Sequence, residues 1–272
     1  MYKINTFENV EVDSNKIIVD KTKSKMLENS EIIFNGINNI LYVEDGVILK
    51  KSNIIFNGSN SIIYISRNVN PYYFSVKTNN NNVFYVGSNC FFNPKGGFSA
   101  LLSEQQNVII GEDGLFSFGI KILTADGHII YSTNTKDRIN QSKSVLIGDH
   151  VWIGQNAVIL KGTKIGSGAI VGANSIASNK KIESNFSVAG NPIKTIRKDV
   201  FFSKELVHNW TEQETENYKE MDTNQWVYES TSNTFDFEKI DIELKLYKDV
   251  DEKLKKLIEL IVENKEKNRF FI

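Results

Sequence analysis

The chain has 272 residues, and its 32 Lys and Arg residues balance 33 Asp and Glu residues to a formal net charge of −1. Such a balance gives no basic excess to attract nucleic acids or anionic membrane surfaces. The single cysteine, Cys90, excludes a disulfide framework within one chain. No stretch offers the roughly 18 apolar residues of a spanning helix, and the N-terminal residues lack the pattern of a secretory signal. We therefore expect a protein of the cytoplasm with no nucleic-acid partner and no integral membrane segment.

The first part of the chain repeats loosely. The string IIFNG occurs at Ile32 and again at Ile54, 22 residues later. Polar residues followed by short apolar runs recur with intervals of 21 to 25 residues, which predicts one solenoid coil per interval. The last interval, from Ile110 to Ile147, is 37 residues and predicts a loop inserted at about residues 124–144. The positions aligned in this way are Tyr42, Tyr64, Tyr85, Ile110 and Ile147.

A strict repeat of six residues follows. This period fits neither an α-helix nor a plain half-buried strand, and it is typical of a chain wound into a coil with flat faces. We expect aliphatic first positions to stack inward as ladders and small fifth positions to fill the corners. The first positions are Ile147, Ile153, Ile159, Ile165, Val171 and Ala177, and the fifth positions are Val151, Ala157, Thr163, Ala169 and Ser175.

The pattern ends near residue 199. Residues 202–221 predict an amphipathic helix capped by Ser203, residues 223–230 predict one strand, and residues 249–267 predict a helix with an apolar face around Leu254 and Ile261. The sequence thus predicts a β-helix domain over residues 1–199 and a small, mainly helical extension over residues 200–272.

The run IGDHVWIGQNAVILKGTKIGSGAIVGANSIAS, followed by SVAGNPIKTIRK, resembles the left-handed β-helix acyltransferases of the hexapeptide-repeat family. The match covers residues 145–198. Within that family, the DGH loop and the tryptophan of VWIG resemble the bacterial polysialic acid and capsular polysaccharide O-acetyltransferases. The resemblance implies a mainly β protein built on a left-handed parallel β-helix. It also implies a homotrimer with active sites between subunits, and direct transfer of an acetyl group from acetyl-CoA to a sugar hydroxyl without an acyl-enzyme.

Such a transfer needs a base for the hydroxyl proton, and His128 in the inserted loop is the candidate. Asp126 or another acceptor could fix its tautomer, and an exposed loop histidine with no role is the plain alternative. His150, at a corner of the strict repeat, is the competing base, while His208 is interpreted as structural. A backbone or indole N–H of Trp152 could meet the thioester oxygen while its ring forms a wall of the acceptor pocket, although packing between subunits would use the same surface.

Acetyl-CoA has a long pantetheine arm and phosphates, which need different partners. Backbone groups at Gly154, Gly172 and Ala173 could bond the amides of the arm, and Ser178 could add a hydroxyl. Basic side chains of the last coils could hold the phosphates, although a solvated basic corner explains them equally well. These side chains are Lys180, Lys181, Lys194, Arg197 and Lys198.

Three other functions stay open. The acceptor could be an amino sugar or a nucleotide-linked sugar that is N-acetylated. A zinc enzyme on the same coil would need three histidine ligands, but only His128 and His150 lie near the coil, so we expect no metal. A non-catalytic scaffold or binding solenoid would not need the inserted loop.

Overall fold

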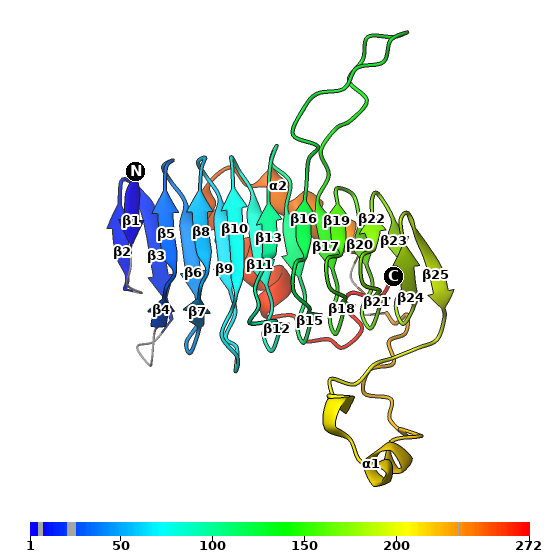
Figure 1. Ribbon diagram of the computed structural model, residues 1–272. Coiled ribbons are helices and arrows are strands. Elements are labelled where there is room, and N and C mark those ends of the chain that lie inside the picture. Colours follow the sequence, from blue (N-terminus) through cyan, green and yellow to red (C-terminus); the bar gives the residue numbers. More distant parts are fainter. Residues whose placement is uncertain (5–7, 21–25, 233, 235) are drawn as a thin grey trace.

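The computed structural model describes residues 1–4, 8–20, 26–232, 234 and 236–272. The chain winds into a solenoid with three flat sheets, of which two run along its length and the third begins at residue 91 (Figure 1). The first sheet has eight strands in the order β1 (Tyr2–Ile4), β5 (Glu31–Phe34), β8 (Asn53–Phe56), β10 (Phe74–Thr78), β13 (Phe98–Leu101), β16 (Lys121–Leu123), β19 (Val158–Leu160) and β22 (Ile176–Ala177).

The second sheet has nine strands: β2 (Val10–Val12), β3 (Asn15–Val19), β6 (Ile40–Val43), β9 (Ile62–Ile65), β11 (Val83–Val86), β14 (Val108–Ile110), β17 (Val145–Ile147), β20 (Lys164–Ile165) and β23 (Lys181–Ile182). The third has six: β12 (Phe91–Phe92), β15 (Leu115–Phe116), β18 (Trp152–Ile153), β21 (Ile170–Val171), β24 (Ser187–Gly190) and β25 (Ile193–Arg197). The strands β4 (Met26–Glu28) and β7 (Ile48–Lys50) form a separate pair. Pairing is antiparallel only at the ends of the solenoid, in β1–β5, β2–β3 and β24–β25 of the described chain.

The hexapeptide register is confirmed. Ile153 pairs with Val171 and Ile159 with Ala177, so three hexapeptides make one coil. All the predicted first and fifth positions are buried, with relative exposures of 0 %. Successive coils approach so closely that a Cβ at Gly154 would lie 2.6 Å from the backbone nitrogen of Ala173. Glycine at this position is therefore required by stacking alone.

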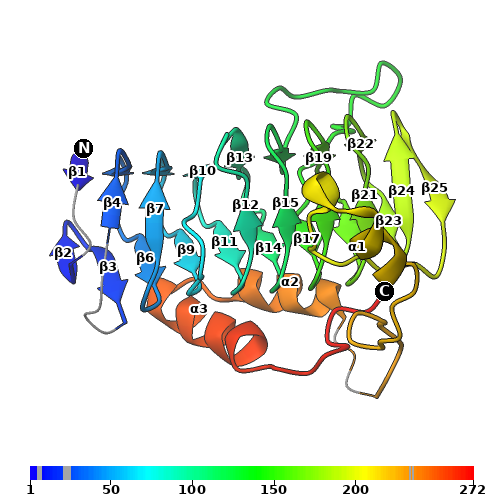
Figure 2. The same ribbon diagram turned by 60° about the horizontal axis from the view of Figure 1, so that its bottom comes forward.

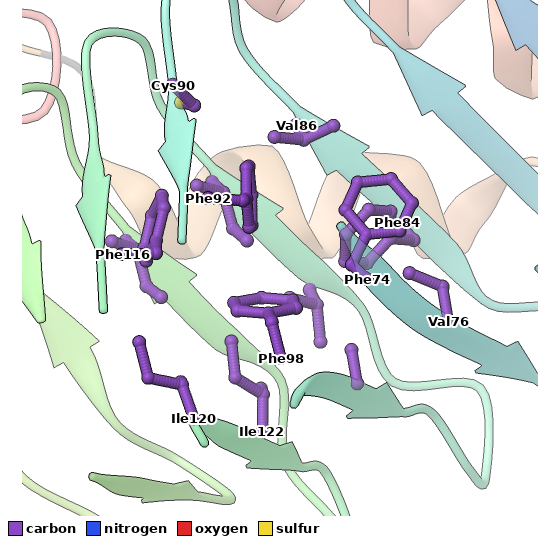
Figure 3. Packing of buried hydrophobic residues seen from close by; sticks show 14 of the residues in the cluster. Phe74, Val76, Phe84, Val86, Cys90, Phe92, Phe98, Phe116, Ile120 and Ile122 are labelled. Carbon is purple, nitrogen blue, oxygen red and sulfur yellow. The ribbon is translucent and has the colours of Figure 1, made fainter. Parts of the chain in front are cut away.

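The earlier coils are wider, and aromatic rings fill them. Ile32 pairs with Ile54, as the repeated IIFNG string predicts. The rings of Phe92 and Phe116 stack with centroids 4.8 Å apart, and Phe98 meets both edge-on (Figure 3). Aromatic rings occupy more volume than the aliphatic side chains of the last coils. The earlier coils therefore need 21 or more residues each to close around their rings.

One predicted register is wrong by a residue. Tyr85 pairs with Ile109 rather than with Ile110, whereas Ile110 pairs with Val86 and Ile147. The reason is the alternation of side chains along a strand. Ile110 and Ile147 point into the solenoid, whereas Tyr85 and Ile109 point outward under the C-terminal helices.

The C-terminal helices cover the outer face of the second sheet (Figure 2). They are α2 (Phe237–Leu246), α3 (Val250–Leu257) and a π-helical turn (Ile258–Val262), and α2 was not predicted. Leu257 and Ile261 pack with Tyr64, Tyr85 and other outward residues of the sheet, which confirms the predicted apolar face. The helix predicted over residues 249–267 begins after the capping residue Asp249 and stops at Val262.

Two predictions for residues 202–230 are wrong. In place of one helix there is a short 3-10 turn (Val207–Asn209) and α1 (Glu212–Asn217), which is capped by Thr211 and Glu214 rather than by Ser203. Neither element buries a side chain, so no packed apolar face supports a longer helix.

The second wrong prediction is the strand, since residues 223–230 form none. The backbone there bonds a side chain instead of a strand, because Asn185 donates to the carbonyl of Trp226 and accepts from the amide of Tyr228.

Candidate active site

Residues 124–144, here called the arm, leave the solenoid between β16 and β17 and project well beyond it (Figure 1). Ile129, Tyr131 and Ile139 on the arm are more than half exposed. His128 is exposed as well, and within the described chain its ring has no hydrogen-bond partner. The arm therefore presents a free imidazole among apolar side chains that this chain leaves uncovered.

Asp126 does not orient the His128 ring within the chain. Its carboxylate accepts from Lys161 Nζ at 2.5 Å and from Asn140 Nδ2 at 2.9 Å. These two donors hold the pKa of the Asp126 carboxyl below its usual value. Asp126 is therefore an anchor of the arm, and no described side chain fixes the tautomer of His128.

Trp152 lies on β18, with 37 % of its surface exposed. Its backbone N–H donates to Ala169 O at 3.0 Å inside the coil. The indole N–H is therefore the donor left for a ligand, and the predicted backbone alternative is already used. The indole ring lies 5.7 Å from the ring of Phe202, the residue at which the C-terminal extension reaches the coil. No contact joins Trp152 to His128 in the described part of one chain.

His150, the competing base, is fully buried, and both of its ring nitrogens lie at hydrogen-bond distance from groups of the chain. Its Nδ1 lies 2.6 Å from Asp113 Oδ2 and its Nε2 lies 2.9 Å from the carbonyl of Phe202. The ring is stacked between Phe202 and Trp226, with centroids 4.1 Å and 5.0 Å away. Because both nitrogens meet acceptors, only the imidazolium form donates to both. His208 lies exposed in the 3-10 turn.

Of the residues predicted to bind the pantetheine chain of acetyl-CoA, some already use their backbone N–H groups within the solenoid. Gly154 and Gly172 donate their N–H groups to Val171 O and Val188 O within the ladder. Ala173 is exposed, and its N–H has no acceptor among the described residues. Ser178 is exposed at the corner one hexapeptide later.

The predicted phosphate-binding residues divide into two groups. Lys180, Lys181 and Lys194 line one cavity of about 460 Å³ at the last coil, together with Phe186. Arg197 and Lys198 are exposed outside its lining, and Lys198 Nζ stands 5.5 Å from the centre of the Phe186 ring. Three of the five basic residues therefore converge on one hollow.

Sequence reasoning missed the residues that hold the site elements in place. Asn140 and Lys161 bond the arm, while Asp113 and Phe202 bond His150. No motif marks any of the four, because each acts through contacts between residues at least 10 positions apart. Among the residues that the structure describes, no group of three His, Cys, Asp or Glu side chains could hold a metal ion. No helix in the same residues is long and apolar enough to cross a membrane.

Comparison with known proteins agrees with the hexapeptide coils. Residues 144–177 match the family described as bacterial transferase hexapeptide (six repeats). Polysialic acid O-acetyltransferase of Neisseria meningitidis is 46 % identical over 114 residues, which are 42 % of this chain and 53 % of that protein. The enzyme of the same name from Escherichia coli O1:K1 / APEC is 38 % identical over 104 residues, 38 % of this chain and 34 % of that protein. The chain thus matches about half or less of the length of these curated relatives.

Solved structures extend the likeness along the solenoid. The crystal structure of the polySia-specific acetyltransferase NeuO superposes with a TM-score of 0.61 at 26 % identity, covering 76 % of this chain and 98 % of NeuO. That of the polysialic acid O-acetyltransferase OatWY gives 0.58 at 24 % identity, covering 75 % and 95 %, and shows the fold. The chain therefore has the left-handed β-helix fold of the hexapeptide acetyltransferases, and the predicted resemblance to polysialic acid O-acetyltransferases is confirmed.

Proposed function

We propose that the protein is an acetyl-CoA-dependent O-acetyltransferase whose acceptor is a sugar hydroxyl of a capsular or surface polysaccharide, with a sialic-acid polymer as the first candidate. The observation that carries the proposal is the free, exposed His128 on an arm that the solenoid itself does not need. The relatives named polysialic acid O-acetyltransferases support the choice of donor chemistry and acceptor. Since the proposed donor is acetyl-CoA, we propose that the reaction takes place in the cytoplasm.

In the proposed reaction the neutral imidazole of His128 takes the proton of the sugar hydroxyl as its oxygen attacks the thioester carbon. The Trp152 indole N–H donates to the oxyanion that forms. When the intermediate collapses, the carbon–sulfur bond breaks, and the thiolate of CoA receives the proton from the imidazolium. The net change is one ester formed and one thioester consumed.

The reacting groups are proposed to come from two copies of the chain. Within one chain the arm projects away from the coils (Figure 1), and no hydrogen bond or ring contact joins His128 to Trp152 among the described residues. The uncovered apolar side chains of the arm, Ile129, Tyr131 and Ile139, fit a surface that packs on a neighbouring subunit. A homotrimer, with three arms reaching three neighbouring coils, is the assembly implied by the resemblance. The cavity lined by Lys180, Lys181 and Lys194 is the proposed seat of the CoA phosphates.

The test is transfer of a labelled acetyl group from acetyl-CoA to polysialic acid, with a neutral glycan and an amino sugar in parallel reactions. We expect label on polysialic acid that hydroxylamine releases, as an ester requires, and a rate for His128→Ala lower by about 10²- to 10⁴-fold. Hydroxylamine-stable label on the amino sugar would favour the N-acetyltransferase. Absence of transfer to every glycan would favour the scaffold. An unchanged rate for His128→Ala would remove His128 from the mechanism.

A further inference from the structure

The arm is held at its stem by one buried amide. Asn140, only 8 % exposed, lies between the two sides of the stem. Its Nδ2 donates to the backbone carbonyl of His128 at 2.7 Å and to Asp126 Oδ2 at 2.9 Å. Its Oδ1 accepts from the backbone N–H of Ile130 at 2.9 Å. Asn140 therefore bonds the main chain at two points directly after the His128 side chain, and it bonds the side chain of Asp126 before it.

A lysine of the next coil fastens this amide to the solenoid. Lys161 Nζ donates to Asp126 Oδ2 at 2.5 Å and to the backbone carbonyl of Asn140 at 3.0 Å. The Lys161 side chain is 16 % exposed and that of Asp126 is 38 % exposed, so the carboxylate side of this contact is open to solvent. Asp126, Asn140 and Lys161 thus form a closed set, which we call the stem lock.

A second contact holds the other side of the stem to the preceding coil. Arg138 donates through Nη1 and Nη2 to the two carboxylate oxygens of Glu104, at 2.9 and 2.8 Å. This pairing lowers the pKa of Glu104 to about 2, mainly through the Arg138 hydrogen bonds and then through Ser142. Charged pairs on both sides therefore fix the stem, but only the stem lock touches the backbone of His128.

We propose that Asn140 is a positioning residue for His128, and that Lys161 acts through it. The reasoning rests on the proposed function. The apolar side chains near His128 are uncovered in this chain, so the direction of the imidazole depends on the backbone at residues 128 and 130. A base displaced by about 1 Å loses on the order of 10²-fold in rate.

The test compares Asn140→Ala, Asn140→Asp and Lys161→Met with the matched control Asn134→Ala. Asn134 lies at the tip of the same arm, and its side chain makes no hydrogen bond among the described residues. We expect the first two variants to lower kcat by about 10- to 100-fold while KM for acetyl-CoA stays unchanged. Asn140→Asp keeps the size and the acceptor oxygen but replaces the amide donors by a carboxylate that faces Asp126, so its loss reports the missing donors together with this repulsion. Lys161→Met should lower kcat less, and Asn134→Ala should leave it unchanged.

A double-mutant cycle separates positioning from a general structural role. If Asn140 acts through His128, adding Asn140→Ala to His128→Ala should leave the residual rate unchanged. A further drop of the same size as in the single variant would overturn the proposal. So would an unchanged kcat for both single Asn140 variants of an active enzyme.

Hydrogen exchange at Ile130 provides a readout that needs no activity, because its N–H donates to Asn140 Oδ1. We expect faster exchange in Asn140→Ala than in Asn134→Ala, and equal exchange would also overturn the proposal. If the wild type transfers no acetyl group to any glycan, the proposed function fails, and the role of Asn140 in positioning a base fails with it. Faster exchange in that case would leave Asn140 as a structural residue of the arm. An active wild type with unchanged variants rejects the further inference alone.

Discussion

His128 and His150 are separated by 22 positions in the sequence and have opposite environments. His128 stands exposed on the arm, and its ring has no partner within the described chain. His150 is completely buried, with both ring nitrogens bonded and an aromatic ring on each face. A histidine that is to accept a proton from a substrate needs a free nitrogen that a substrate can reach. Of these two histidines, His128 has one and His150 does not.

The same contrast applies to the segments that carry the two histidines. The arm is held at its stem by side-chain hydrogen bonds to its own backbone, and its outer part is uncovered. The corner at His150 is covered by the C-terminal extension through Phe202 and Trp226. Side chains that bond one another stabilise the fold. A side chain without partners, on a backbone that hydrogen bonds hold in place, is available for chemistry. The two histidines should therefore respond differently to the same substitution.

The largest expected contrast is in stability. His150→Ala removes a ring from the stack, leaves the carbonyl of Phe202 without this partner, and leaves Asp113 with Lys204 as its side-chain donor. We expect the free energy of unfolding to fall by about 2–4 kcal/mol, somewhat less than for a fully buried pair because Asp113 is partly exposed. His128→Ala should change it by less than about 0.5 kcal/mol. Urea denaturation measures both, and equal losses would contradict the comparison.

A smaller effect is expected from Asp113→Asn, and it should depend on pH. Burial raises the pKa of Asp113, but the hydrogen bonds from His150 and Lys204 outweigh it and leave the pKa below its usual value of 3.8. A lowered pKa stabilises the fold above the unfolded value and loses this contribution as the pH falls through the folded value. We expect Asp113→Asn to cost about 1 kcal/mol at pH 7.

The difference between wild type and Asp113→Asn should shrink as the pH drops below about 4, because the wild-type carboxyl then takes up a proton as well. Denaturation of the two proteins at pH 7, 5 and 3 measures this difference directly. Carboxylates common to both proteins cancel in the comparison. A difference that stays constant down to pH 3 would show that the charge of Asp113 is not what stabilises the His150 corner.

Much of the fold could be predicted from the sequence because the repeat is local. Each hexapeptide shows its own inward position, so Ile153 and Ile159 could be assigned without knowing their partners. The register at Tyr85 could not, because an outward aromatic and an inward aliphatic residue look alike until the helices that cover the sheet are known. The strand predicted in the C-terminal extension is wrong for a related reason. The backbone groups of Trp226 and Tyr228 bond the side chain of Asn185, which is distant in the sequence.

The candidate site divides in the same way. His128 could be singled out because it interrupts a periodic chain, and Lys180, Lys181 and Lys194 because their charges cluster. The burial of His150 could not be foreseen, because its partners Asp113 and Phe202 lie 37 and 52 residues away. Asn140 is one of many asparagines, and only the folded stem distinguishes it from the others.

An effect of similar size is expected where the His150 corner meets Trp152. Phe202→Leu keeps the carbonyl that accepts from His150 but removes the ring that stacks on His150 and lies 5.7 Å from Trp152. We expect a loss of about 1 kcal/mol in the free energy of unfolding. Because Trp152 then loses a neighbour on one side, KM for the polysaccharide should rise by a few fold while KM for acetyl-CoA stays unchanged. Phe201→Leu is the matched control, since the Phe201 ring faces Trp226 at 6.1 Å and no ring contact joins it to Trp152 in the described chain. Equal KM values for both variants would mean that the buried corner at His150 stabilises the coil without shaping the site.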